Sequence, residues 1–175
     1  SESRLLRIGS FTLFYVAQGL PIGLISIALP AWLAEQAASI SDIAYFVAIS
    51  GLPWGFKLLA GPLMDRFSYL PMGRRRPWII AAQGGLLLSV CLLGLIPDPG
   101  NNIVLLTWIA FLINSFAAVQ DVAVDGMAID VLPEEERGKA NAFMGFGQVA
   151  GFSGSAAACG YALVNFGIAG AATFL

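Results

Sequence analysis

The sequence predicts an all-α protein that crosses a membrane several times, and two observations support this fold class. Of the 175 residues, 58% are apolar, only 11% are charged and 20 are glycine, a composition that does not describe a water-soluble surface. In addition, apolar runs of about 20 residues or more recur along the chain, and a helix needs that length to span the hydrocarbon of a bilayer. We therefore expect a multi-pass membrane protein.

The apolar runs predict five complete helices and the start of a sixth. The first run is too long for a cleavable signal peptide and four more follow it, so it stays in the mature chain. Ser41 and Asp42 can cap the second helix, the turn at 97–102 (PDPGNN) ends the third, and Pro133 ends the fourth. The predicted spans are 8–35, 41–66, 77–97, 103–131, 139–166 and, as a truncated sixth helix, 168–175.

The distribution of basic residues predicts how the helices are oriented. Eight of the nine lie before the first helix, between the second and third, or between the fourth and fifth, which is one side of the membrane. They are Arg4, Arg7, Arg66, Arg74, Arg75, Arg76, Arg137 and Lys139. The loops on the other side carry only Glu35, Asp42 and Asp98. Because lysine and arginine concentrate in cytoplasmic loops, we expect a cytoplasmic amino terminus.

Several polar residues lie inside the predicted helices. Counted at about 1.5 Å per residue from the cytoplasmic ends, Lys57, Asp121, Gln18 and Gln148 are roughly 14 to 15 Å deep and Asp125 is roughly 9 Å deep. A charge in the membrane costs about 2.5 to 3.5 kcal/mol and usually faces a bundle interior or an aqueous cavity. We therefore expect helices one, two, four and five to meet near mid-bilayer. Helix three has no charge and can lie against lipid.

The fourth helix carries three aspartates with two different settings. Asp121 and Asp125 are one turn apart on one face, and Asn114 lies two turns before Asp121 on nearly the same line. Asp130 points the opposite way, toward cytoplasmic arginines or helix ends.

One lysine against two acids in these helices leaves one acid in excess, which can take up and release a proton. Three interpretations stay open: a structural ion pair of Lys57 with one acid, proton coupling by an acid, and direct contact with a substrate. The candidates for lining a substrate cavity are Gln18, Asn114, Gln120 and Gln148.

Small residues are dense in helices one, two and five. Gly147 and Gly151 form a GxxxG face that allows two helix backbones to approach closely. Plain helix packing explains these glycines, and bends in helices with polar groups at mid-membrane are also what a rocking transporter needs.

Enzyme and metal sites find little support in the sequence. The chain has no histidine, and its two cysteines, Cys91 and Cys159, lie in apolar runs without metal-ligand spacing. Intramembrane aspartyl proteases need their two acids on separate helices, whereas Asp121 and Asp125 share one. The DGMA segment at 125–128 lacks the arginine that CDP-alcohol phosphotransferases have at the position of Ile129. We expect no enzyme, no cofactor, no bound metal and no nucleic-acid partner.

The segment GPLMDRFSYLPMGRRRPW, residues 61–78, resembles the loop between helices two and three of the major facilitator superfamily, G-x-x-x-D-R-x-G-R-R. Five extra residues separate Arg66 from Gly73, and this spacing is similar to that of AmpG-type muropeptide permeases and of the related acetyl-coenzyme A transporters. The resemblance extends to GLPIGL with Trp32 in helix one, FKLLAGPLMDR in helix two, QDVAVDGMAIDVLPEEERG at 120–138 and the glycine-rich helix five.

The resemblance implies a permease of twelve or more helices in two pseudo-symmetric halves, of which residues 1–175 are most of the amino-terminal half and the carboxy-terminal half is absent. It implies proton-driven import of anhydromuropeptides by alternating access across the bacterial inner membrane. Its partners would be a muropeptide-like substrate, protons, the lipid bilayer and the absent half. The alternatives are a carrier of acyl-coenzyme A or another organic anion, and a transport-inactive membrane assembly factor.

The same resemblance implies a cytoplasmic gate around the loop between helices two and three. A positive-inside anchor explains the arginines alone, but it does not explain Asp65 beside them. The expected gate residues are Asp65, Arg66, Gly73, Arg74, Arg75, Asp130 and Arg137.

Overall fold

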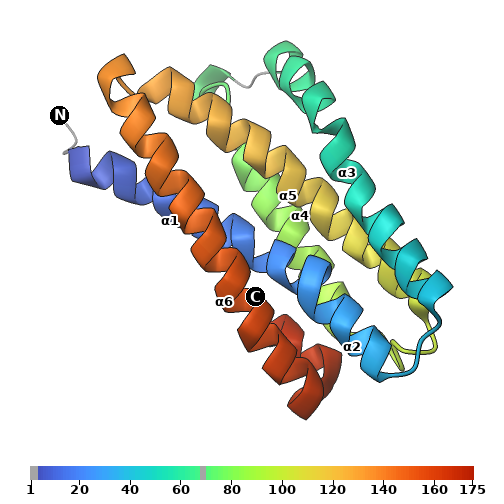
Figure 1. Ribbon diagram of the computed structural model, residues 1–175. Helices are drawn as coiled ribbons and strands as arrows, with labels where there is room; N and C mark the ends of the chain where they lie inside the picture. The colour runs from blue at the N-terminus through green and yellow to red at the C-terminus, as the bar shows by residue number, and fades with distance from the viewer. Residues whose placement is uncertain (1–3, 68–69) are drawn as a thin grey trace.

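The computed structural model describes residues 4–67 and 70–175, and within them the chain is helical with no β-strand (Figure 1). The elements are α1 (Arg4–Gly23), the π-helical segment η1 (Leu24–Ala28), α2 (Leu29–Glu35), α3 (Ile40–Arg66), the 3-10 turn η2 (Leu70–Met72), α4 (Arg76–Gly94), α5 (Ile103–Val131) and α6 (Glu134–Thr173).

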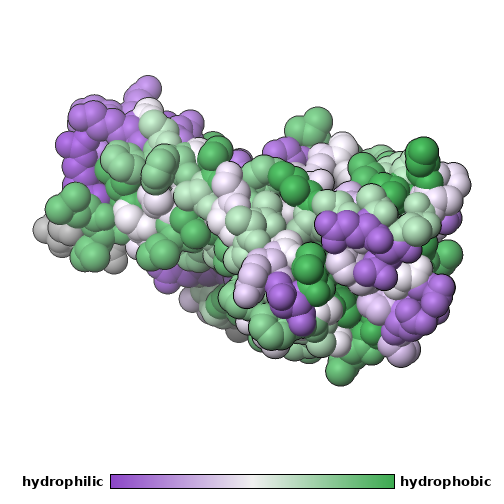
Figure 2. All heavy atoms as spheres, turned by 60° about the horizontal axis from the view of Figure 1, so that its bottom comes forward, coloured by the Kyte–Doolittle hydropathy of each residue, from purple (hydrophilic) through white to green (hydrophobic). Residues whose placement is uncertain are grey.

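Five stretches of the described residues are long and apolar enough to cross a membrane: Arg4–Glu35, Ile40–Arg66, Arg76–Gly94, Ile103–Val131 and Glu134–Thr173. Large apolar side chains such as Leu58 and Leu88 are exposed on them, 80% and 68% respectively, which suits contact with lipid rather than water. On the face seen in Figure 2, hydrophilic side chains gather mainly toward the two ends and apolar ones dominate between them. The predicted fold class, an all-α multi-pass membrane protein, is confirmed.

Three helix ends differ from the predicted ones by three residues or more. The first helix begins at Arg4 rather than at residue 8, and α4 ends at Gly94 rather than at residue 97, because the N–H groups of Leu95 and Ile96 turn back onto the carbonyls of Leu92 and Leu93. The helix expected to start at residue 139 begins at Glu134, with three glutamates in its first turn. Acidic side chains stabilise the positive end of a helix, but a criterion of apolar length does not detect a charged turn.

The first membrane-spanning stretch is not a uniform helix. Its turns widen over Leu24–Ala28, where the N–H of Leu29 bonds the carbonyl of Leu24, five residues back. Pro30 follows directly and has no N–H to donate, so regular α-helical bonding cannot resume until after it.

In α6, Gly167 has φ of 70° and ψ of −168° and breaks the helix between the predicted spans 139–166 and 168–175.

The backbones of α1 and α6 touch because glycine lies on both sides of their contact, and Figure 1 shows the two helices crossing (dark blue and orange). A methyl group added at Gly151 would lie 2.1 Å from the carbonyl oxygen of Val16, and one at Gly23 would lie 2.2 Å from that of Phe152. Ser155 adds a hydrogen bond of 2.6 Å to the carbonyl of Leu20. Close approach of this kind is typical of small residues in membrane helices.

The buried apolar side chains form two clusters, one toward each end of the bundle. The first cluster includes Leu24, Phe46, Leu93 and Ile113. The second includes Phe11, Met64, Ile79, Val124 and Met144, and it lies toward what we call the basic end, the end that carries Arg7, Arg75 and Arg137. Along α1, α3, α5 and α6, the buried polar side chains other than Thr107 fall between the two clusters. This polar layer holds the site described below.

Substituting Gly151 with alanine should destabilise the protein by about 1 to 3 kcal/mol, because the added methyl group overlaps the backbone of α1. The measurement is thermal unfolding of the full-length protein in detergent, followed by circular dichroism. Gly154→Ala is the matched control on the same helix, since a methyl group there meets nothing within 4 Å. Equal stability of the two variants would contradict the close contact of α1 with α6.

Candidate functional site

Three helices meet at one buried carboxylate in the polar layer. Lys57 on α3 places its Nζ 2.9 Å from Oδ2 of Asp121 on α5. Gln18 on α1 donates a hydrogen bond from Nε2 to the other oxygen of the same carboxylate, Oδ1. The side chain of Asp121 is 5% exposed and that of Lys57 is 39% exposed. Asp121 therefore lies inside the bundle, and Lys57 reaches it from a more open position.

Asp125 lies one turn farther along α5 and has a different partner. The hydroxyl of Tyr15 on α1 donates to Oδ1 of Asp125. Asp125 is half-buried, and among residues 4–67 and 70–175 no lysine or arginine forms an ion pair with it. Tyr15 was not among the predicted site residues. It lies three residues before Gln18, so helical spacing could have placed both side chains on one face of α1.

An open hollow of about 470 Å³ lies beside these groups. Its lining residues come from α1, η1, α3, α5 and α6, and they are Tyr15, Ile22, Ser26, Trp54, Lys57, Asp121, Asp125 and Gln148. The Nζ of Lys57 also lies 5.7 Å from the centroid of the Trp54 ring, a distance at which a cation is attracted to the ring face. The hollow thus offers a cation, carboxylates, a hydroxyl, an amide and an aromatic ring to a polar ligand.

Three predicted cavity residues do not line this hollow, and one of them, Gln18, contacts Asp121 from inside the bundle instead. Asn114 is buried against α3, where its Nδ2 donates to the carbonyl of Ser50 at 2.7 Å. Gln120 turns toward α4, where its Oε1 accepts a hydrogen bond of 2.9 Å from Nε2 of Gln83. Neighbouring helices cover these positions, which a helical projection of α5 alone does not reveal. The two side chains join helices, whereas Gln18 and Gln148 do lie at the site.

At the basic end, Arg75 connects the loop after α3 to α5. Its Nη2 lies 2.7 Å from Oδ1 of Asp65, and its Nε lies 3.8 Å from Oδ2 of Asp130. Gly126 makes room for the guanidinium, since a methyl group there would lie 2.7 Å from Nε of Arg75. Gly73, with φ of 87°, allows the loop to turn back toward α5.

The other predicted gate residues differ in their partners and exposure. Arg137 donates to the carbonyls of Ile129 and Leu132 at 2.9 and 3.2 Å, so it caps the end of α5 and pairs with no acid among the described residues. Arg66 and Arg74 have exposed side chains.

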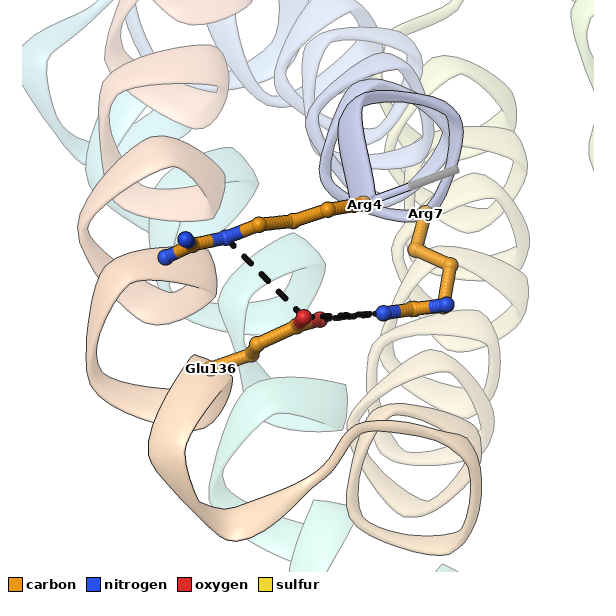
Figure 3. A network of polar contacts seen from close by, with 3 residues as sticks. All are labelled: Arg4, Arg7 and Glu136. Atoms are coloured by element: carbon orange, nitrogen blue, oxygen red, sulfur yellow. Dashed lines mark hydrogen bonds and ion pairs between the residues drawn. The ribbon is translucent and has the colours of Figure 1, made fainter. Parts of the chain in front are cut away.

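An ion-pair cluster not predicted from the sequence joins the starts of α1 and α6. Nη2 of Arg7 lies 2.8 and 2.9 Å from the two oxygens of Glu136, and Nε of Arg7 lies 3.2 Å from one of them. Arg4 is farther away, with its Nε 3.9 Å from Oε1. Figure 3 shows both arginines pointing from α1 toward Glu136. The acidic first turn of α6 was the available signal, but its partner on α1 depends on how the helices pack.

Comparison with known proteins gives relatives for most of the chain. The family model described as Major Facilitator Superfamily matches residues 11–175. The anhydromuropeptide permease of Escherichia coli is 38% identical over 122 residues, which are 70% of this chain and 24% of the permease. An uncharacterized protein of Haemophilus influenzae is 35% identical over 139 residues (79% of this chain, 32% of the relative). An uncharacterized protein of Schizosaccharomyces pombe is 31% identical over 147 residues (80% and 28%). The chain thus spans about a quarter to a third of these relatives.

A double-mutant cycle should separate the two arginines that face Glu136. We expect a coupling free energy of about 1 to 3 kcal/mol between Arg7 and Glu136, because the contact is bidentate and partly buried. For Arg4 and Glu136 we expect about 0 to 1 kcal/mol, because Arg4 is 49% exposed and more distant. The measurement is unfolding of alanine variants by SDS in mixed micelles. Equal coupling energies would contradict the assigned geometry.

Proposed function

Because this chain belongs to the major facilitator superfamily, we propose that it is the amino-terminal part of a proton-driven secondary transporter that imports anhydromuropeptides. One observation carries the proposal: Lys57, Asp121 and Asp125 border an open hollow inside a bundle of membrane-spanning helices. Ionisable groups at such a depth mark substrate or proton pathways in membrane proteins. The similarity to the anhydromuropeptide permease supports the choice of substrate.

The hollow suits the chemistry of this substrate class. An anhydromuropeptide consists of N-acetylglucosamine joined to an anhydro-N-acetylmuramyl peptide, so it presents hydroxyls, amides and peptide carboxylates. Lys57 can attract a carboxylate, Gln148 and Ser26 can hydrogen-bond amides or hydroxyls, and Trp54 offers a flat apolar face to a sugar ring. In the proposed transporter, a carboxy-terminal half would supply the opposite wall and the remaining specificity.

Alternating access requires helices that bend and an end of the bundle that opens. The widened turn at Leu24–Ala28 lies next to the hollow, and the break at Gly167 gives α6 a second point of bending. At the basic end, Arg75 with Asp65 and Asp130 forms the proposed gate, and the exposed Arg66 and Arg74 lie beside it. The excess of basic residues at this end supports a cytoplasmic amino terminus. The similarity to the permease of Escherichia coli supports the inner membrane of a bacterium.

The first test is uptake of radiolabelled anhydromuropeptide by the full-length protein in proteoliposomes under an inward proton gradient. We expect uptake that collapses when a protonophore removes the gradient. Lys57→Gln should lower the initial rate by about tenfold or more, which corresponds to about 1.4 kcal/mol of lost interaction free energy. Lys139→Gln is the matched control, because Lys139 is an exposed basic residue outside the hollow.

Either of two results would contradict this proposal. Folded wild-type protein that takes up no anhydromuropeptide would exclude this substrate and redirect the search to acyl-coenzyme A and other organic anions. Equal uptake by Lys57→Gln and Lys139→Gln would exclude the hollow at Lys57 as the transport site.

A further inference from the structure

The two carboxylates that border the hollow are held in different ways. Asp121 accepts from Lys57 on one oxygen and from Gln18 on the other, and its side chain is 5% exposed. Asp125 accepts from a single neutral donor, the hydroxyl of Tyr15, and it is half-buried at the wall of the hollow. Asp121 is thus enclosed and paired, whereas Asp125 is open to the hollow and, within the described ranges, has no ion-pair partner.

The charges around Asp125 favour proton binding there. The ionisable groups that face it are Tyr15 from α1, Lys57 from α3 and Asp121 from its own helix, while α6 presents the neutral amide of Gln148. With both acids ionised, one cation faces two anions and the cluster carries one net negative charge. A proton on Asp125 makes the cluster neutral. A proton on Asp121 would instead remove the charge that attracts the Nζ of Lys57, 2.9 Å away, in a pair whose acid is enclosed in the bundle.

We propose that Asp125 carries the proton that drives transport, that Asp121 holds Lys57 in a permanent ion pair, and that Tyr15 positions Asp125. This assignment rests on the proposed proton-driven transport. The Asp125 carboxylate takes a proton from the compartment to which the hollow is open and becomes a neutral acid. It returns the proton after the hollow has opened to the other compartment. One proton moves, and no covalent bond besides O–H forms or breaks.

Protonation of Asp125 also changes one contact between α1 and α5. The hydroxyl of Tyr15 donates to a charged acceptor while Asp125 is ionised, and charge-assisted hydrogen bonds are roughly twice as strong as neutral ones. The bond therefore weakens when the proton arrives. The second contact between these helices, Gln18 with Asp121, keeps its charge and stays in place. Proton binding thus loosens α1 from α5 at Tyr15 without releasing Lys57.

Infrared difference spectroscopy between two pH values tests the assignment without a substrate, on full-length protein in liposomes. A carbonyl-stretch band of a protonated carboxyl group should be present in the wild type and absent in Asp125→Asn. It should persist in the double variant Lys57→Met/Asp121→Asn, which removes both charges of the pair and so leaves no unpaired cation. Tyr15→Phe should keep the band and move it to higher frequency, because the carbonyl loses a hydrogen-bond donor. A band that persists in Asp125→Asn and disappears in the double variant would overturn the assignment.

Transport gives a second, independent readout with radiolabelled anhydromuropeptide and the membrane potential clamped at zero. One proton per substrate and an imposed gradient of about one pH unit should give about tenfold accumulation in the wild type. Asp125→Asn should give no accumulation while still exchanging internal for external substrate. The double variant should accumulate in response to the gradient, even at a lower rate. Accumulation by Asp125→Asn would overturn the proposal, whereas absence of all uptake by the wild type would contradict the substrate and leave the infrared test to decide on Asp125.

Discussion

Each charge inside the membrane must find a partner within the protein, and the contact of Lys57 with Asp121 satisfies this requirement for two helices at once. Gln18 adds a third helix to the same carboxylate. The pair lies between the two apolar clusters, one toward each end of the bundle. Because hydrocarbon cannot solvate an unpaired charge, this one carboxylate ties α1, α3 and α5 together at a single point.

Two kinds of contact hold α1, and they differ in how easily they change. Against α6 its backbone is in direct contact through glycines, a packing that separates only if the helices come apart. Against α5 it makes hydrogen bonds from Tyr15 and Gln18 to two carboxylates, beside apolar contacts within the second buried cluster. Polar contacts of this kind respond to protonation and to a charged ligand, whereas van der Waals contacts do not. The hollow therefore lies beside the hydrogen bonds that join α1 to α5, which protonation or a charged ligand can change.

The ends of the bundle are held by a different set of charges. Arg75 ties the loop after α3 to α5, and Arg7 ties the start of α1 to Glu136 at the start of α6. The two pairs differ in exposure. The acids that contact Arg75 are about half exposed, so these contacts contribute modestly to stability and can break at low cost. Arg7 and Glu136 are more buried and bidentate, so their contact is the stronger of the two.

The sequence by itself determined which segments are long and apolar enough to cross a membrane, and that Lys57, Asp121 and Asp125 lie inside such segments, because apolar length is a local property of the chain. The predicted spans 139–166 and 168–175 also meet at Gly167, where the structure breaks α6. The sequence did not reveal the start of α6 at Glu134, since charged turns fall outside an apolar run. Only the tertiary structure decided that Lys57 pairs with Asp121 rather than Asp125, that Tyr15 contacts Asp125, and that Asn114 and Gln120 face other helices. The physical reason is that side chains on one face of a helix differ in environment because different neighbouring helices cover them. The rotation and crossing of those neighbouring helices depend on contacts between residues that are far apart in the sequence.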